Sequence, residues 1–270
     1  MGVADRELVG VVELDHPEPA GPEGPGASLR PASRPRFWRE LTVVVVFYVA
    51  YELIADVTAG SRYAALSNAL AEVHLERAMG LFHEQAIQHF FLGDLWLVQA
   101  SNDFYATVHF VMPVVALVWL WWKFPGRYRR WRNALAWLTG ISLVVFVAFP
   151  VLPPRLLPAT YRFVDTMQAL GGAGRLDGVL LSDVGNAYAA MPSLHVAWAA
   201  WCAAALVCSV RRWWLKVLLV ADPIATTFVV VVTANHLFLD VIGGALVLVA
   251  GIGLSRVPWP RLGPRSRRWG

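Results

Sequence analysis

The sequence predicts an all-α polytopic membrane protein, a six-transmembrane-helix bundle with one amphipathic helix at the membrane interface. Of the 270 residues, 57% are hydrophobic and only 16% are charged, which is too apolar for a soluble domain of this size. The apolar residues gather in runs of about 20, the length that crosses the hydrocarbon core of a bilayer. The 13 tryptophans fit a chain that needs anchors at two membrane surfaces.

Three parts are predicted along the chain. Residues 1–33 are rich in Pro, Gly and Glu and lack an apolar period, which is typical of a disordered N-terminal tail. Residues 34–258 form the six-span domain, and residues 259–270 form a basic C-terminal tail. From the apolar runs we expect spans at 38–56, 97–122, 133–151, 194–210, 214–233 and 236–255.

Two longer segments connect these spans. Residues 61–93 mix Leu, Ala and Phe with several charged residues, which predicts an amphipathic helix lying at the interface rather than a span. Residues 152–192 contain several prolines and glycines and are predicted to form a long loop. Loops of this length often carry function.

The basic residues predict the orientation. The tail before span one, the 2–3 and 4–5 connections and the segment after span six hold all but five of the 23 Lys and Arg residues. We therefore expect a protein of the cell (inner) membrane. The positive-inside rule places both of its termini in the cytoplasm and the loops before His195 and His236 outside. The net charge of +4 therefore reflects topology, and we expect no nucleic-acid partner.

The segment Met191–His195 carries the first candidate site residues. Ser193 follows a proline and precedes an apolar run, which is typical of a helix N-cap. The backbone N–H groups of Leu194 and His195 would then face outward at a helix start, where anions bind. Alternatively, His195 is a histidine of the membrane interface that is solvated by water.

The start of the last predicted span carries the second group. His236 and Asp240 are four residues apart and would share one face of a helix. The carboxylate would then fix the tautomer of the imidazole and leave its other nitrogen free to attack an electrophile. Alternatively, the two side chains form a buried ion pair that joins helices, although such pairs are costly to bury.

Four further residues are candidates for binding the substrate. Arg155, at the end of the third span on the outer face, is a candidate phosphate anchor, and Arg162 is a weaker one. An interfacial arginine that snorkels to lipid headgroups is the alternative. Tyr105 and His109, one turn apart in span two, could bind a headgroup hydroxyl, but an interhelical hydrogen-bond patch is the favoured interpretation.

These motifs resemble the type 2 phosphatidic acid phosphatase superfamily, whose six-helix membrane core carries three separated signatures. Pro192 to His195 match the second signature, His236 and Asp240 match the third, and Arg155 matches the arginine that ends the first. The resemblance implies that His236 is the nucleophile, that Asp240 orients it and that His195 protonates the leaving oxygen. Arg155 would hold the phosphate, and no metal or other cofactor would be needed.

Three departures from the family pattern refine the resemblance. Leu194 replaces a glycine, while Ala148 and Val230 stand where basic residues are expected. This pattern is closer to the inositol phosphorylceramide synthase-like branch, which implies an integral membrane phosphotransferase that moves a phosphoryl group or phospho-headgroup between lipids. A lipid phosphate phosphatase that uses water is the alternative. A non-enzymatic transporter component fits less well, because its ionisable residues would lie near the midplane.

Overall fold

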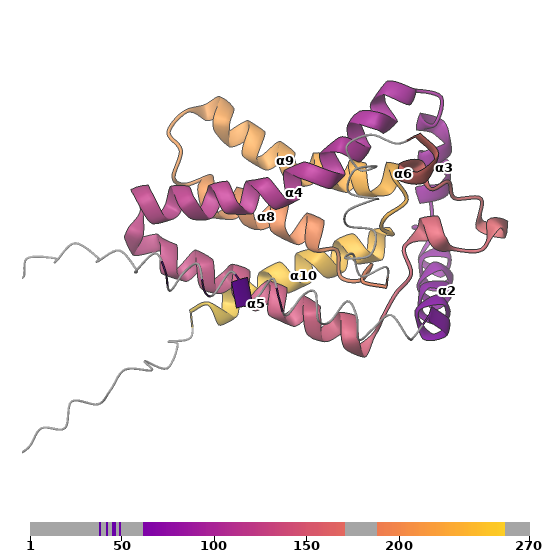
Figure 1. Ribbon diagram of the computed structural model, residues 1–270, viewed down its shortest axis with the longest axis horizontal. Coiled ribbons are helices and arrows are strands. Elements are labelled where there is room, and N and C mark those ends of the chain that lie inside the picture. Colours follow the sequence, from indigo (N-terminus) through magenta and orange to yellow (C-terminus); the bar gives the residue numbers. More distant parts are fainter. Residues whose placement is uncertain are drawn as a thin grey trace, which may run out of the picture. The chain divides into compact units, whose positions relative to one another are not determined.

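The computed structural model describes a helical chain (Figure 1). The described residues are 62–170 and 188–256 and, as single helical positions, 38, 42, 45, 46 and 49. Within them every regular element is a helix, and the one β-type contact is an isolated bridge between Val151 and Ala189. The predicted all-α class is therefore confirmed for this part of the chain.

Several predictions fall on residues that the structure does not describe. The predicted tails at 1–33 and 259–270 lie outside the described residues, as does most of the predicted first span at 38–56. Residues 171–187, in the middle of the predicted loop 152–192, also lie outside them.

The segment predicted as one amphipathic helix at 61–93 forms two helices. α2 (Arg62–Met79) ends at Gly80, whose φ of 70° lies in the left-handed region that glycine adopts freely, and α3 (Glu84–Phe91) follows. The buried face of α2 consists of Ala65, Ala69, Glu72, Val73 and Glu76. This face is partly acidic, so it differs from the apolar face expected of an interfacial helix. The prediction of one continuous helix is wrong, and its place at the interface stays a prediction.

Helices α4 (Leu95–Lys123) and α5 (Pro125–Ala148) are joined by Phe124 alone. α5 begins well before the predicted start at residue 133, so the arginine-rich stretch is part of the helix and not a loop. Pro125 explains the early start, because a proline in the first helical position has a suitable fixed φ and lacks an N–H that would be unpaired there. The long side chains of arginine also favour a helix.

The predicted spans at 194–210, 214–233 and 236–255 correspond to three helices, α8 (Leu194–Leu206), α9 (Trp213–Val232) and α10 (Phe238–Leu254). In the described part of the chain, three helices are long and apolar enough to cross a membrane, namely α4, α5 and α9. α8 and α10 are apolar but have only 13 and 17 residues, which is short of the roughly 20 that a full span needs. The apolar helices indicate a multi-pass membrane protein, but six spans are not confirmed.

The packing of these helices produces two apolar clusters. The first lies where α4, α5, α8 and α10 meet, around the fully buried Trp201. The indole N–H of Trp201 donates to the carbonyl of Trp131 at 3.0 Å, and that of Trp198 donates to Oγ1 of Thr139 at 3.1 Å. Each indole thus buries its ring and still satisfies its one donor, which fixes α8 against α5.

The second cluster lies beside the candidate site. It joins the small residues of α2 to Val151, Leu152 and Leu157 after α5 and to Leu237 before α10. The segment after α5 contains two short 3₁₀ helices, η1 (Pro154–Leu156) and η2 (Ala159–Tyr161), followed by α6 (Thr166–Leu170).

Buried amides hold this segment in place. The side-chain amide of Gln88 on α3 donates to the carbonyls of Val164 and Val232, and its oxygen accepts from the N–H of Val164. Asn102 on α4 makes two hydrogen bonds with Thr166. The part of the predicted loop that the structure describes is therefore tied to α3, α4 and α9.

Candidate active site

The first turn of α8 carries polar groups, although the helix itself is apolar. Oγ of Ser193 accepts a hydrogen bond from the N–H of Val196 at 3.4 Å, which confirms Ser193 as the N-cap. The N–H groups of Leu194 and His195 have no carbonyl one turn back within the helix. An anion placed at this helix start would be stabilised by those groups and by the helix dipole.

A tight turn after α9 sends the chain toward the same place. The N–H of Ala234 donates to the carbonyl of Val231, and that of Asn235 donates to the carbonyl of Val230, which together form a Schellman motif. Ala234 occupies the left-handed position of this motif with a φ of 52°, where glycine is usual. This strained alanine lies two residues before His236, and backbone strain of this kind is common at functional sites.

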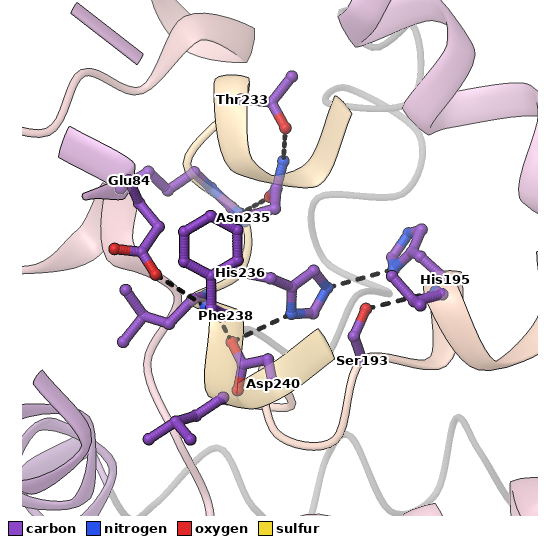
Figure 2. A network of polar contacts seen from close by, with 12 residues as sticks. Glu84, Ser193, His195, Thr233, Asn235, His236, Phe238 and Asp240 are labelled. Atoms are coloured by element: carbon purple, nitrogen blue, oxygen red, sulfur yellow. Dashed lines mark hydrogen bonds and ion pairs between the residues drawn. The ribbon is translucent and has the colours of Figure 1, made fainter. Parts of the chain in front are cut away.

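His236 and Asp240 are in contact, although not in the way the spacing predicts. α10 begins at Phe238, so His236 precedes the helix, and the expectation that the two side chains share a helix face is wrong. Instead, Asp240 in the first turn reaches back. Its Oδ2 accepts from the N–H of Leu237 at 2.9 Å and lies 3.3 Å from Nδ1 of His236 (Figure 2). A proton on Nδ1 is thereby favoured, which leaves the lone pair on Nε2 free.

The second imidazole lies on the opposite side of His236. Nε2 of His236 is 3.4 Å from Nδ1 of His195, which belongs to the first turn of α8 (Figure 2). His236 is 4% exposed and Asp240 is fully buried, while His195 is half-buried, so the three side chains form a row that is shielded at its Asp240 end. The predicted meeting of two imidazoles and one carboxylate is thus seen in the structure.

Two aromatic rings of α4 cover His195. The ring of Tyr105 stacks on His195 with centroids 4.2 Å apart, and the ring of His109 lies 4.0 Å from it. Both residues are therefore brought to the cluster through ring contacts. Their predicted role in binding a headgroup stays a prediction. The interhelical hydrogen bonds of this face are made instead by Asn102.

Arg155 joins the cluster through the residue before His236. Its guanidinium donates to Oδ1 of Asn235, its backbone N–H donates to the carbonyl of Ala234 at 2.9 Å, and its Nε lies 3.5 Å from Oδ2 of Asp165 (Figure 2 shows Asn235). The Arg155 side chain is 22% exposed. It is therefore held by acceptors that a phosphate could join or replace.

Arg162 is placed differently. It ends η2 with a φ of 56°, and its carbonyl pairs with the ring of His89. None of the contacts that join the histidine cluster in the described residues involves its side chain.

The two helix starts at the site differ in their readiness to bind an anion. At α10 the N–H groups of Leu237, Phe238 and Leu239 already donate to carboxylates of Asp240, Glu84 and Glu76. At α8 the first turn carries only the Ser193 cap. Of the two helix starts, that of α8 is therefore the one whose N–H groups are left for an anion.

Glycines let the two helix starts approach closely. A Cβ on Gly244 of α10 would lie 2.6 Å from the carbonyl oxygen of Ser193, and one on Gly243 would lie 3.1 Å from Cβ of Pro192. The N–H of Ser193 also donates to the carbonyl of Asp240 at 3.0 Å. Gly243, Gly244 and Gly251 thus allow close packing of α10, whereas a Cβ on Gly253 would have no atom within 4 Å.

Sequence reasoning missed several polar residues around the site. Glu76 on α2 and Glu84 on α3 bind the start of α10, although each lies more than 150 residues earlier in the chain. Glu72 and Glu76 are one turn apart, a spacing that places both on one face of α2. The pattern gave no sign that this face is the buried one. Asn235 and Asp165, which contact Arg155, carried no signal of their own.

Among residues 62–170 and 188–256, no group of three His, Cys, Asp or Glu side chains could hold a metal ion. The expectation of a metal-independent site stays a prediction.

The described fold and site define a multi-pass helical membrane protein that gathers two histidines, an aspartate and an arginine between the starts of two apolar helices. The model of the PAP2 superfamily matches residues 72–254, about two thirds of the chain and nearly all of its described part. The chain therefore belongs to the PAP2 superfamily. No curated protein and no solved structure shows a significant match. Members of the superfamily are phosphatases and phosphotransferases, which supports an enzyme.

Proposed function

We propose that this protein is an integral membrane phosphotransferase that moves a phosphoryl group or phospho-headgroup between lipids through a phosphohistidine on His236. The row Asp240–His236–His195 carries the proposal. Asp240 holds Nδ1 of His236, and Nε2 of His236 faces the second imidazole. This arrangement supplies a nucleophile, its orienting group and a proton donor within one row of contacting side chains.

The first half-reaction uses both imidazoles. Nε2 of His236 attacks phosphorus, the bond from phosphorus to the lipid oxygen breaks, and His195 donates a proton to that oxygen. Negative charge on the phosphoryl oxygens is stabilised by Arg155 and by the N–H groups at the start of α8. In the second half-reaction, His195 takes the proton from an acceptor hydroxyl whose oxygen displaces His236.

The distance between the imidazoles shows what substrate binding has to do. Nε2 of His236 and Nδ1 of His195 are 3.4 Å apart, which is a hydrogen-bond length with no room for a phosphoryl group between them. Binding therefore has to part the two rings. His195 belongs to α8, and its ring packs against the rings of Tyr105 and His109 on α4. Those α4 residues would therefore guide the movement.

The missing basic residues of the family pattern favour a transferase of the inositol phosphorylceramide synthase-like branch. Val230, at a position where an arginine is expected, is fully buried and offers no charge. Arg155 is the one guanidinium that the described contacts place beside His236. A site with fewer cations holds a phosphate less tightly, which suits the transfer of a phosphodiester headgroup with less charge on phosphorus.

The side of the membrane follows from the charge distribution. With the arginine-rich start of α5 and Arg211 and Arg212 before α9 in the cytoplasm, the starts of α8 and α10 face the extracytoplasmic side. Substrate lipids of the outer leaflet would then reach the site laterally.

Product analysis tests the proposal. The purified protein in mixed micelles is given phosphatidylinositol labelled in its phosphate, with ceramide or diacylglycerol as acceptor, and in parallel labelled phosphatidic acid alone. The proposal expects label in a new phospholipid and none in His236→Gln, which removes the nucleophile while retaining a hydrogen-bonding side chain. Free phosphate as the sole labelled product would point to the phosphatase alternative, with water as acceptor.

A further inference from the structure

Four buried carboxyl groups surround the start of α10. Glu72 and Glu76 come from α2, Glu84 comes from α3, and Asp240 belongs to α10 itself. Their exposed fractions are 5% for Glu72 and zero for the other three. Figure 2 shows Glu84 bound to the N–H of Phe238, next to Asp240. So many carboxylates cannot all be charged in one buried place without strong repulsion.

The hydrogen bonds of the cluster leave some of its oxygens without a donor. One oxygen each of Glu76, Glu84 and Asp240 accepts an N–H of α10. Among the described residues, both oxygens of Glu72, Oδ1 of Asp240 and the second oxygens of Glu76 and Glu84 have none. A buried acceptor without a donor costs about 1–3 kcal/mol, and more when it is charged. A proton on Glu72 would pair one of its oxygens with Oδ1 of Asp240, because its O–H could then donate to that atom.

The electrostatics agree with this location of the proton. Burial, followed by the nearby charge of Asp240, raises the pKa of Glu72 to about 10. Asp240, by contrast, already has Oδ2 against one N–H and one imidazole nitrogen, so Oδ1 is the oxygen that remains to accept a hydrogen bond. The charged or titratable groups that face Glu72 are Glu76 from its own helix, Glu84 from α3 and Asp240 from α10.

We propose that Glu72 acts in its protonated form as a positioning residue, donating its O–H to Oδ1 of Asp240 and so aiming Oδ2 at Nδ1 of His236. This inference rests on the proposed function of His236 and extends it by one residue. Glu72 does not touch the substrate. It stops the Asp240 carboxylate from rotating away, so that the tautomer with a free Nε2 is kept.

The neutral state of Glu72 matters as much as its hydrogen bond. An ionised Glu72 has no O–H to donate and repels the Asp240 carboxylate, so Oδ2 of Asp240 would no longer be held against Nδ1 of His236. The proton on Glu72 is kept at neutral pH and lost as the pH rises through about 10. Turnover should therefore fall at alkaline pH, for a reason that lies outside the two histidines.

Two substitutions at Glu72 distinguish the effect of its hydrogen bond from the effect of its volume. In Glu72→Gln the amide N–H₂ donates to Oδ1 of Asp240 at every pH, whereas Glu72→Leu has similar volume and no donor. His74→Gln, on the exposed side of α2, is the matched control. The probe is phosphatidylinositol labelled in its phosphate, with full-length protein in mixed micelles.

We expect Glu72→Gln to keep turnover close to wild type and to lose the fall above pH about 10. Glu72→Leu should lose about 10- to 100-fold, as when an outer-shell partner of a functional side chain is removed. His74→Gln should behave like wild type in both respects. Glu72→Gln as inactive as Glu72→Leu, or an unchanged alkaline fall in Glu72→Gln, would overturn the proposal.

Infrared spectroscopy tests the protonation without any turnover, so the inference can fail separately from the proposed function. At neutral pH the wild-type protein should show a carbonyl band of protonated carboxyl groups that weakens in Glu72→Gln and is unchanged in His74→Gln. An undiminished band in Glu72→Gln would show that Glu72 is charged and would end the proposal even if the enzyme proved active.

Discussion

Gly244 gives the sharpest test of how the two helix starts are held together. A Cβ at this position would lie 2.6 Å from the Ser193 carbonyl oxygen and 3.5 Å from the N atom of Ala197. Ordinary contacts of a Cβ begin near 3.4 Å, so in Gly244→Ala the start of α10 has to move about 0.8 Å away from α8. That movement would lengthen the 3.4 Å contact between His236 and His195 by a similar amount.

The two expected consequences differ in size. Overpacking of this kind costs about 1–3 kcal/mol, and the better helix propensity of alanine returns about 1 kcal/mol. The midpoint of thermal unfolding, followed by tryptophan fluorescence in detergent, should therefore fall only slightly. Turnover of a labelled phospholipid should fall by about 100-fold, because a misplacement near 1 Å has that effect on aligned reacting groups.

Gly253→Ala is the matched control in the same helix. A Cβ there meets no atom within 4 Å, so this variant should be as active as wild type and slightly more stable, through the helix propensity of alanine. If Gly244→Ala matched Gly253→Ala in both unfolding midpoint and turnover, the close approach of α8 and α10 would not position the site, and the reasoning would be refuted.

Three further predictions concern the anchor, the metal and the membrane side. Arg155→Ala should raise KM for a phospholipid by about 10- to 150-fold because charged hydrogen bonds are lost, and Arg155→Lys should raise it less. Arg162→Ala is the control. Equal effects at both positions would contradict the role of Arg155 as the phosphate anchor. EDTA should leave the initial rate unchanged, and a loss restored by a divalent cation would contradict metal independence. An impermeant maleimide should label Thr160→Cys in intact cells. It should label the native Cys208, which is exposed beyond the other end of α8, only after permeabilisation. The reverse pattern would show that the topology is inverted.

The sequence predicts those parts of the fold that depend on local pattern. Apolar runs located α4, α8, α9 and α10 to within a few residues, because a helix in lipid must be apolar along its length. The helix-start signal in the sequence also predicted the N-cap correctly at Ser193, whose hydroxyl caps α8. The break at Gly80 was missed, since one glycine between two amphipathic stretches interrupts the pattern very little.

The candidate site also contains some contacts that the sequence predicts and others that it does not. The spacing of His236 and Asp240 predicted their contact, although the contact is made by a first-turn carboxylate reaching back rather than by a shared helix face. The glutamates of α2 and α3 were missed because their partners, the N–H groups of α10, lie at the other end of the chain. Long-range pairing of this kind leaves no local pattern. Only the fold shows that the charged face of α2 is the buried one.

The central claim is that Nε2 of His236 forms a bond to phosphorus. The most direct measurement is rapid denaturation of the full-length protein during turnover of a phosphate-labelled phospholipid, followed by mass spectrometric mapping of labelled peptides. The account predicts an acid-labile, alkali-stable phosphate on the Nε2 atom of His236, absent in His236→Gln. Turnover with no label on the protein, or with label on another residue, would contradict it.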